Sequence, residues 1–297
     1  MTAVSFNTAE LSQLRGKTIL LTGCSSGIGR ATAMTAYKNG ANLILADWNE
    51  KELNGLVEEL QGHGRQQGRL AFRKTNVADW NDMVEVFDHG FKTFGVIDAV
   101  ISNAGVNWGE SLLEHNVDPV TDKLKPPSLE GLQINIIGHI YAVNCATYYF
   151  AKRQNSQCQI IITSSAAAFL DSPPLHLYSA AKAGLVGMMR SLRHDLPKQG
   201  ITINVVAPWM TMTPMAPDLL KKVWESLPCN SPEGVGHALL FPILRPEVHG
   251  KCFFVAGNEI IEIEDALETS RPSWMGKELS ASIDEGQKRV LGARPFG

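Results

Sequence analysis

The feature that most constrains the fold is a regular alternation of short apolar runs with longer segments of helical periodicity. The short runs are rich in branched apolar residues and predict buried strands at residues 18–22, 42–46, 70–72, 97–102, 160–163, 201–206 and 252–256. Apolar residues recur at helical spacing over residues 28–39, 50–60, 80–94, 132–153 and 178–196. A further helix is predicted from Ser231, with Pro232 at its first position. The alternation predicts an α/β fold in which helices cover both faces of a doubly wound, parallel sheet.

One domain accounts for this pattern, and the length of 297 residues is compatible with a single α/β domain. The last predicted strand ends near Gly257, so we expect one catalytic domain over residues 1–257. Residues 258–297 are expected to form a C-terminal extension, in which Pro272 and Pro295 break any long helix.

Three long segments follow predicted strands, at the edge of the sheet where ligands bind in doubly wound folds. We expect these segments, residues 106–128, 168–175 and 208–230, to be substrate loops. Their bulky apolar side chains either line a pocket or pack beneath the loops, and they are Trp108, Leu112, Leu170, Leu175, Trp209, Met210, Met212, Met215 and Trp224.

Composition and charge exclude several classes of protein. A hydrophobic fraction of 44% and a charged fraction of 19% are typical of globular domains and exclude a disordered or collagen-like chain. A formal net charge of -3 offers no general attraction for nucleic acid or anionic membranes. The five cysteines are scattered, without a Cys-x-x-Cys pair, which favours a reducing compartment and no metal site. With neither a signal-like start nor a long apolar run, we expect a cytoplasmic protein.

The first predicted strand runs directly into a glycine-rich loop that opens a helix, Thr22-Gly23-Cys24-Ser25-Ser26-Gly27-Ile28-Gly29. Glycines at these places let the backbone turn sharply and approach a pyrophosphate, whose charge the helix N-terminus then meets. The position between a strand and a helix favours a phosphate-binding loop over a plain glycine turn. Cys24 in this loop fits a small neutral filler better than a redox-sensitive thiol.

An acidic residue, Asp47, ends the second predicted strand. It lies at the distance downstream where a carboxylate meets the hydroxyls of an adenosine ribose, and it would repel a 2′-phosphate. Neither Trp48 nor Ser26 supplies the positive charge that NADP would favour, so we predict NAD as the cofactor. Two alternatives stay open, since Asp47 could merely cap the next helix and Arg30 could reach a phosphate.

A tyrosine and a lysine lie one helical turn apart in Tyr178-Ser179-Ala180-Ala181-Lys182. A phenol has an ordinary pKa of about 10, and a nearby cation favours its deprotonated form. We therefore expect Lys182 to lower the pKa of Tyr178, although the pair could also be an ordinary exposed pair on a helix. Ser165 precedes Tyr178 by 13 residues and follows the predicted strand 160–163.

Together with the glycine-rich loop, these residues resemble the short-chain dehydrogenase/reductase family over about residues 15–257. The resemblance implies a Rossmann-type domain in which Ser165 and Tyr178 hold the substrate oxygen and Lys182 binds the nicotinamide ribose. It also implies that Asn135 anchors a water leading to the lysine, which completes a catalytic set of Asn135, Ser165, Tyr178 and Lys182. Ser165 is preferred to Ser164 because of its spacing to the tyrosine.

The same resemblance implies a cofactor-binding set that is drawn from most of the predicted strand ends. Its members are Gly23, Ser25, Ser26, Gly27, Ile28, Gly29, Asp47, Trp48, Asn76, Val77, Asn103, Ala104, Gly105, Tyr178, Lys182, Pro208, Thr211 and Thr213.

This chain also departs from the family pattern. Trp209 follows Pro208 where glycine is usual, which places a bulky ring near the nicotinamide. The usual Asp-Val pair at the adenine is Asn76-Val77 here, and the segment between Gly105 and Asn135 is longer than usual. These departures concern the substrate pocket more than the binding of cofactor.

The sequence therefore predicts an NAD-dependent oxidoreductase that interconverts a secondary alcohol and a ketone, with oxidation favoured. The substrate is expected to be bulky and mostly apolar, similar to a steroid, prostaglandin or terpenoid, and His176 either lines its pocket or is packed or solvated. Small residues on the catalytic helix, together with the resemblance, imply a homodimer or homotetramer; they are Ala180, Ala183, Gly184 and Gly187. The alternatives are an NADPH-dependent carbonyl reductase, a non-redox cyclase or isomerase on the same scaffold, and a nucleotide-sensing protein that has lost catalysis.

Overall fold

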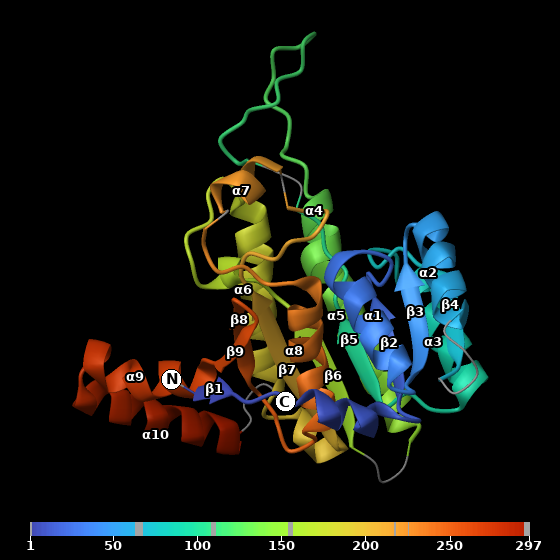
Figure 1. Cartoon of the computed structure of the whole chain (residues 1–297). Coiled ribbons are helices and arrows are strands. Elements are labelled where there is room, and N and C mark those ends of the chain that lie inside the picture. The colour runs from blue at the N-terminus through green and yellow to red at the C-terminus, as the bar shows by residue number, and fades with distance from the viewer. Residues whose placement is uncertain are drawn as a thin grey trace.

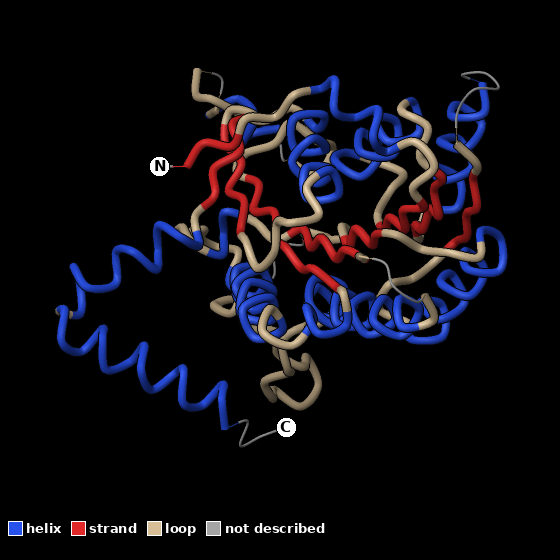
Figure 2. Tube along the Cα trace, turned by 90° about the horizontal axis from the view of Figure 1, so that it is seen from below, coloured by secondary structure: helices blue, strands red, loops and turns tan. Residues whose placement is uncertain are grey.

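The computed structural model describes residues 2–62, 68–107, 111–153, 157–216, 218–224 and 226–293. Within these residues one sheet of nine strands has the order β1-β9-β8-β7-β6-β5-β2-β3-β4, with helices on both of its faces (Figure 1, Figure 2). The strands are β1 (Thr2–Val4), β2 (Thr18–Thr22), β3 (Asn42–Asp47), β4 (Leu70–Lys74), β5 (Ala99–Ser102), β6 (Cys158–Thr163), β7 (Ile201–Pro208), β8 (Cys252–Ala256) and β9 (Glu259–Glu262). The helices are α1 (Gly27–Lys38), α2 (Glu50–Gly62), α3 (Trp80–Phe94), α4 (Glu130–Leu132), α5 (Gly138–Ala151), α6 (His176–Leu192), α7 (Asp218–Val223), α8 (Pro232–Leu244), α9 (Glu264–Met275) and α10 (Lys277–Ala293).

The strands from β8 to β4 run parallel, which confirms the doubly wound sheet expected from the sequence. β2 pairs with β3 on one side and with β5 on the other, so the strand order reverses between β2 and β5. The carboxyl ends of the parallel strands meet at one edge, where Thr22, Ser102 and Thr163 lie close together. Ligands of doubly wound sheets bind at such a reversal point.

Each face of the sheet has its own core. On one face α1, α2 and α8 bury residues such as Ala33, Leu56 and Leu239 against the strands. On the other face α3, α5 and α6 bury Phe87, Ala146 and Met189, among others. Strands covered on both faces are apolar along their whole length, which explains why the sequence shows continuous apolar runs and not alternation.

The sheet continues past Gly257, where the sequence pattern placed the end of the core. Gly257 and Asn258 both have positive φ, +58° and +65°, and form a tight turn that returns the chain antiparallel to β8 as β9. The N-terminal strand β1, which was not predicted, pairs antiparallel with β9. The Gly-Asn pair between two apolar runs is a hairpin signal, and it was overlooked.

Residues 264–293 form two helices, α9 and α10, which extend away from the sheet as a pair (Figure 2). The expectation that Pro272 would break the helix was wrong, because α9 continues through it to Met275. Pro272 is exposed, so water can bond the Glu268 carbonyl that the proline cannot. Pro295 lies outside the described residues.

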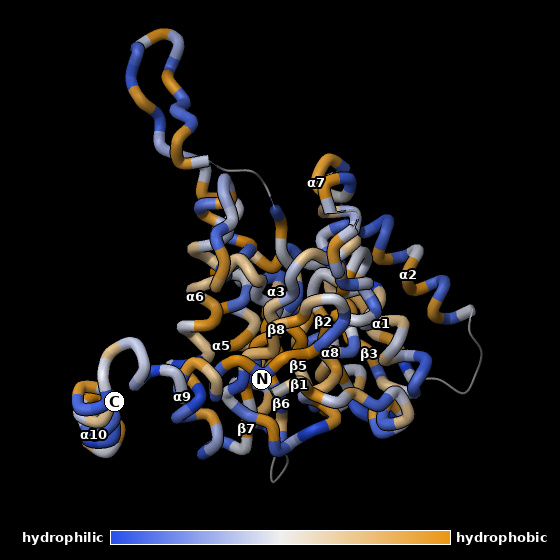
Figure 3. The backbone as a smooth tube through the Cα atoms, turned by 60° about the vertical axis from the view of Figure 1, so that its left-hand side comes forward, coloured by the Kyte–Doolittle hydropathy of each residue, from blue (hydrophilic) through white to orange (hydrophobic). Residues whose placement is uncertain are grey.

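Two of the expected substrate loops have structure of their own. Residues 111–128, which we call the entrance arm, rise beyond the carboxyl edge of the sheet (Figure 1) and are internally paired by a single bridge between Val117 and Leu124. Segment 208–230 contains the short helix α7. Apolar and polar residues are mixed along the arm and also along α7, whose sequence is DLLKKV (Figure 3).

Candidate active site

The glycine-rich loop has a backbone that only small residues allow. Gly23 and Gly27 have positive φ, +65° and +50°, and a Cβ added at Gly23 would lie 2.6 Å from the Ala104 Cα. A Cβ at Gly29 would lie 1.9 Å from the Gly23 carbonyl oxygen. The loop therefore depends on glycine for its shape, as a loop whose backbone approaches a pyrophosphate should.

Neighbouring strand ends hold the loop in place. The Asn103 side-chain amide donates to the carbonyls of Thr22 and Gly23, at 3.2 and 3.1 Å. The Thr22 hydroxyl accepts from the backbone amides of Asn103 and Ala104. Cys24 is buried, and burial, together with the Asp47 charge, holds the pKa of its thiol well above the ordinary value. A thiol that stays protonated agrees with the filler role that we favoured for Cys24.

Asp47 is buried at the end of β3, and each of its carboxylate oxygens holds one backbone amide. Oδ2 accepts from the Ser25 amide at 2.9 Å and Oδ1 accepts from the Asn49 amide at 3.0 Å. The second contact fixes the turn before α2, which is the alternative role that the sequence left open. Because each carboxylate oxygen has a further lone pair, Asp47 can hold the loop and also accept from a ribose.

A hollow of about 350 Å³ lies beside Asp47, between the loop and α2. Its lining includes Ser26, Arg30 and Glu52, so one cation and one carboxylate face the same space. Arg30 forms an ion pair with Glu59. The charge that could receive a 2′-phosphate is thus already paired with a carboxylate.

Ser165 and Tyr178 come together at the ends of β6 and α6. The Ser165 hydroxyl lowers the pKa of the neighbouring Tyr178 phenol, whereas burial, which has the larger effect, raises it. Ser165 Oγ also accepts from the Ala167 amide at 3.2 Å, while the buried Ser164 Oγ donates to the Lys182 carbonyl at 2.7 Å. Ser165 is therefore the serine that meets the tyrosine.

Lys182 is buried beneath the tyrosine, with Nζ 5.6 Å from the Tyr178 ring centre. Nζ donates to the Thr163 carbonyl at 3.0 Å. Burial lowers the pKa of Lys182 to about 7. We expected Lys182 to lower the pKa of Tyr178, but that pKa is raised, because the loss of hydration outweighs the opposing effect of Ser165.

Asn135 lies in a single π-helical turn, Gln133–Ile137, between α4 and α5. Its side chain brackets Val106, accepting from the Val106 amide at 3.0 Å and donating to the Val106 carbonyl at 2.9 Å. A Cβ added at Gly105 would lie 3.1 Å from Asn135 Oδ1 and 3.4 Å from Lys182 Nζ. Gly105 thus separates the asparagine from the lysine, and its lack of a side chain lets both approach the turn after β5.

The segment after β7 is fixed at its base by the fully buried Asn230. Its backbone amide donates to the Met210 carbonyl at 2.7 Å, and its backbone carbonyl accepts from the Met212 amide at 3.0 Å. Its side-chain Nδ2 donates to the Val255 carbonyl at 2.8 Å. Thr211 Oγ1 donates to the Trp209 carbonyl. Sequence reasoning missed Asn230, which no motif marks, because its role depends on strand ends that are distant in the chain.

The remaining residues of the predicted cofactor set lie along the same edge. Thr213 approaches the glycine-rich loop, since a Cβ at Gly27 would lie 3.2 Å from its Cγ2, and Pro208 ends β7. Trp48 is exposed beside Asp47, and Ile28 is half-buried in the first turn of α1. Asn76 is exposed, and the buried Val77 packs against Gly138.

The bulky residues of the three expected loops differ in their surroundings. The rings of Trp209 and Trp224 meet edge to face with centres 4.8 Å apart. Leu112, Leu170 and Met215 are exposed, and the remaining described members are half-buried, namely Leu175, Met210 and Met212. Trp108 lies outside the described residues.

A second residue that the sequence analysis missed lies behind the site. His139 is buried one turn after Asn135, and its Nδ1 is 2.7 Å from the Ser102 hydroxyl. Burial first, and then the Lys182 charge, hold the pKa of His139 well below its ordinary value, so this imidazole is neutral. The sequence signal available for His139 was its spacing of four residues from Asn135, which places both side chains on the same face of a helix.

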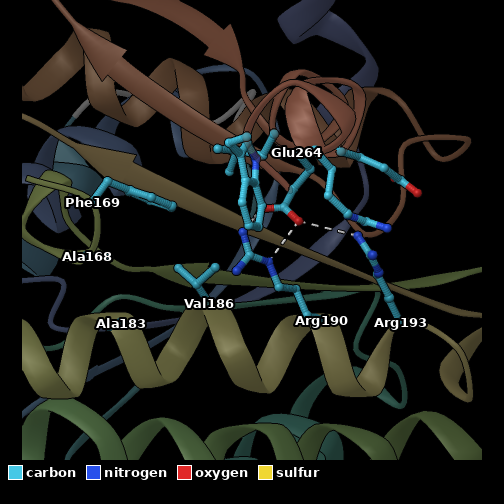
Figure 4. Close-up of a pocket in the computed structure, with 11 residues that line it drawn as sticks. Ala168, Phe169, Ala183, Val186, Arg190, Arg193 and Glu264 are labelled. Atoms are coloured by element: carbon cyan, nitrogen blue, oxygen red, sulfur yellow. Dashed lines mark hydrogen bonds and ion pairs between the residues drawn. The ribbon is translucent and has the colours of Figure 1, made fainter. Parts of the chain in front are cut away.

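A separate hollow of about 520 Å³ lies between α6 and α9, and none of the predicted catalytic residues lines it (Figure 4). Glu264 is buried there, and its carboxylate receives two hydrogen bonds from Arg190, at 2.9 and 2.7 Å, and one from Arg193 at 3.4 Å. This cluster attaches the C-terminal extension to the catalytic helix, which agrees with a docked tail.

Within the described ranges, no group of three or more His, Cys, Asp or Glu side chains could hold a metal ion. No helix in that part of the chain is both long enough and apolar enough to cross a membrane. None of the five cysteines, all of which lie in the described ranges, forms a disulfide.

Residues 17–224 match the family described as short chain dehydrogenase. A short-chain dehydrogenase/reductase of Penicillium rubens is 29% identical over 296 residues, covering 93% of this chain and 85% of the relative. A 3-oxoacyl-[acyl-carrier-protein] reductase of Thermotoga maritima is 30% identical over 236 residues, covering 77% of this chain and 91% of the relative. A 5′-hydroxyaverantin dehydrogenase of Dothistroma septosporum is 27% identical over 298 residues, covering 94% and 95%.

Solved structures resemble the fold closely. A 7α-hydroxysteroid dehydrogenase, solved with NADH and 7-oxo glycochenodeoxycholic acid, superposes with a TM-score of 0.72 at 22% identity, covering 86% of this chain and 98% of that one. A short-chain dehydrogenase from Burkholderia cenocepacia, solved with NADP, has a TM-score of 0.70 at 25% identity and covers 82% and 98%.

Proposed function

Because the chain belongs to the short-chain dehydrogenase family, we propose that it is an NAD-dependent oxidoreductase that interconverts a secondary alcohol and a ketone. The proposed substrate is a bulky, mostly apolar small molecule, and oxidation is the favoured direction. One observation carries the proposal, namely that the neighbouring Ser165 and Tyr178 lie beside the buried Lys182, whose Nζ is 5.6 Å from the tyrosine ring centre. A hydroxyl pair above a buried cation suits a reaction in which negative charge develops on a substrate oxygen.

The residues at the carboxyl edge fit a nicotinamide dinucleotide. The glycine-rich loop leaves a cradle that a single Cβ at Gly29 would fill, and it leads into the N-terminus of α1. Lys182 uses one of its three donors on Thr163, which leaves two for the hydroxyls of a ribose. When bound, the nicotinamide exchanges a hydride with the substrate carbon.

The charges around Asp47 support NAD over NADP. Asp47 and Glu52 are both close to the ribose end of the proposed site, and Arg30 is paired with Glu59. A 2′-phosphate would meet two carboxylates and no unpaired cation among these residues. The relatives do not decide this point, since the fold neighbours were solved with NADH and with NADP.

In the direction of oxidation, Tyr178 passes its own phenol proton on towards Lys182 and takes up the proton of the substrate hydroxyl, while Ser165 holds the oxygen. Lys182, at its lowered pKa of about 7, can pass a proton at neutral pH. Asn135 fixes the turn at Val106 that borders the lysine. In this order, a proton leaves the substrate through Tyr178 and then through Lys182.

Exposed apolar side chains around the site support an apolar substrate. Leu112, Leu170 and Met215 come from three different loops, and Leu219 of α7 is also exposed. Side chains of this kind at an active-site mouth favour a substrate with a large apolar body, similar to a steroid, prostaglandin or terpenoid. A relative at 27% identity is named for the dehydrogenation of 5′-hydroxyaverantin, which also supports oxidation of an alcohol.

The test is a titration of the purified protein with NAD, NADH, NADP and NADPH, followed by a panel of apolar secondary alcohols read at the nicotinamide absorbance. We expect tighter binding of NAD and NADH, and alcohol-dependent reduction of NAD. Tyr178→Phe should lower kcat by about 10²- to 10⁴-fold while cofactor affinity stays within a few fold. Full activity in that variant would refute the mechanism, and turnover without net change in absorbance would favour a non-redox enzyme.

A carbonyl reductase that uses NADPH is the second candidate. Arg30 lines the hollow beside the loop, and a relative at 30% identity is named a 3-oxoacyl-[acyl-carrier-protein] reductase. The same titration separates the two candidates, because the reductase requires tighter binding of NADPH than of NADH.

We also propose a homo-oligomer in the cytoplasm. Gly187 and Ala183 lie on an exposed face of α6, and a Cβ at Gly187 would meet nothing within 4 Å, so a second helix can approach closely. That none of the five described cysteines forms a disulfide supports a reducing compartment.

A further inference from the structure

His176 connects the entrance arm to the catalytic helix. It is the first residue of α6, two positions before Tyr178, and its Nδ1 is 3.1 Å from the backbone nitrogen of Leu112. A backbone N–H can only donate, so Nδ1 is the acceptor of this bond. Among the uses that the sequence left open for His176, the structure provides neither simple packing nor free solvation, but a bond between the start of α6 and the predicted substrate loop 106–128.

The position of His176 is itself well fixed. Its backbone amide donates to the Pro174 carbonyl at 2.8 Å, and the Leu175 amide donates to Ser172 at 2.8 Å. These contacts fold the end of segment 168–175 against the start of α6. The ring is therefore an anchor that the catalytic helix and its preceding loop hold in place.

The entrance arm is internally braced, so an anchor at its base can orient the whole arm. Asp118 accepts from the amides of Val120 and Thr121, at 2.9 and 3.0 Å, and its carboxylate pairs with Lys125 at 3.3 Å. Val117 and Leu124 form the bridge between the two sides of the arm. These contacts hold residues 116–125 together, and Leu112 lies at the base of the arm that leads into them.

The base of the arm presents apolar side chains at the mouth of the site. Leu113 is 79% exposed, and Leu112 is also exposed, as is Leu170 on the neighbouring loop. Small displacements of the arm therefore change how much apolar surface a large substrate meets, while a small substrate, bound at Ser165 and Tyr178, would not reach it.

We propose that His176 is a positioning residue that sets specificity for bulky substrates by holding the entrance arm through the Leu112 amide. This proposal rests on the proposed dehydrogenase function. His176 acts through the arm and not on the reacting atoms, so its effect should fall on the KM of large substrates. The values of kcat and of the KM for NAD should not change.

Two variants separate the hydrogen bond from the side chain that makes it. His176→Ala removes the acceptor, while His176→Asn places Oδ1 at the same distance from the backbone as Nδ1 and can accept the same bond. The Leu112 amide is exposed enough for water to replace the lost partner, so both variants should fold.

The first measurement compares cyclohexanol, a compact secondary alcohol, with a hydroxysteroid. In His176→Ala we expect the KM for the hydroxysteroid to rise about three- to tenfold, the range that one hydrogen bond explains, with the KM for cyclohexanol within twofold. His176→Asn should restore most of the difference. Equal effects on both alcohols, or no rescue by asparagine, would overturn the proposal.

The second measurement does not depend on turnover. Hydrogen exchange followed by mass spectrometry, without substrate, should show peptides over residues 111–128 exchanging about three- to tenfold faster in His176→Ala, and near the wild-type rate in His176→Asn. Unchanged exchange in the alanine variant would show that no such anchor exists. If the wild type oxidises none of the alcohols, the proposed function fails, and the exchange result alone decides whether His176 holds the arm.

Discussion

The two halves of the carboxyl edge are built in different ways. In the half formed by β2, β3 and β5, polar side chains such as the half-buried Asn103 and the buried Asp47 bond to the backbone of the glycine-rich loop. In the half that follows β6 and β7, long segments carry exposed apolar side chains such as Leu170 and Leu219. The first half has one shape that its hydrogen bonds define, whereas the second has apolar surface whose fit depends on what binds there.

This difference separates the part of the site that the chain has in common with its family, the glycine-rich loop, from the part that is particular to this chain, the substrate loops. A loop defined by backbone geometry tolerates few substitutions, because an added side chain collides with the surrounding backbone. Loops with exposed apolar side chains can change residue by residue while the sheet stays folded. The comparison predicts that substitutions in the first half strongly lower the affinity for the cofactor. Substitutions in the second half should instead change which substrates the enzyme accepts.

The largest effect in the first half is expected at Gly29. In Gly29→Ala the new Cβ would lie 1.9 Å from the Gly23 carbonyl oxygen, so the loop must open. We expect a loss of about 2–4 kcal/mol in the free energy of unfolding and a loss of about 100-fold or more in NAD affinity. Denaturant unfolding and a fluorescence titration with NAD measure the two quantities.

Gly286→Ala is the matched control, because Gly286 lies within α10 and a Cβ there would meet nothing within 4 Å. Alanine in a helix interior is favoured over glycine by about 0.5–1 kcal/mol, so this variant should be as stable as the wild type or slightly more so. If Gly286→Ala lost as much stability and NAD affinity as Gly29→Ala, the effect would come from replacing any glycine. That result would contradict the view that the geometry of the loop sets the shape of the site.

A smaller effect is expected at Asp47. Asp47→Asn keeps an oxygen that can accept from one backbone amide but removes the charge, so the loop should survive while the preference between cofactors changes. We expect NAD affinity to fall about tenfold and the preference for NAD over NADP to shrink by a similar factor, as expected for one lost charged hydrogen bond. Direct titration of both cofactors measures this.

Adding Glu59→Gln sharpens that experiment, because it frees Arg30 from its ion pair. An exposed ion pair contributes about 0–1 kcal/mol, so stability should change little, while NADP should bind more tightly than in the single variant. If both variants keep the wild-type ratio of NAD affinity to NADP affinity, Asp47 acts only on the turn before α2.

The same contrast explains how much the sequence could predict. The parallel strands, the helices that cover them and the loop after β2 follow from local patterns, because burial on both faces produces continuous apolar runs. The contact between Ser165 and Tyr178 could be expected from a resemblance to a family.

The residues that the sequence did not reveal act across long distances in the chain. Asn230 fixes a loop through Met210, 20 positions earlier, and Val255, 25 positions later. β1 finds its partner in β9, at the other end of the chain, and neither strand is longer than four residues. Pairing of this kind is fixed by the completed fold and leaves no periodic signal in the local sequence.

The burial of Lys182 at the boundary between the two halves makes stability depend on pH. Its pKa falls from 10.5 to about 7 because the folded chain withholds water from the ammonium group. Between these two values the unfolded chain binds a proton that the folded chain does not, so the free energy of unfolding should rise with pH in this window. Below about pH 7 both states are protonated and the folded state bears the full cost of the buried charge.

Lys182→Met isolates this contribution, since methionine is apolar and of similar length. Measured by denaturant unfolding without cofactor from pH 7 to 9.5, the wild type should gain up to about 1.4 kcal/mol per pH unit relative to the variant. At pH 7 the variant should be the more stable of the two, because it buries no charge. If the two curves stay parallel, the ammonium keeps its ordinary pKa in the folded chain, and Lys182 could not pass a proton at neutral pH as the proposed oxidation requires.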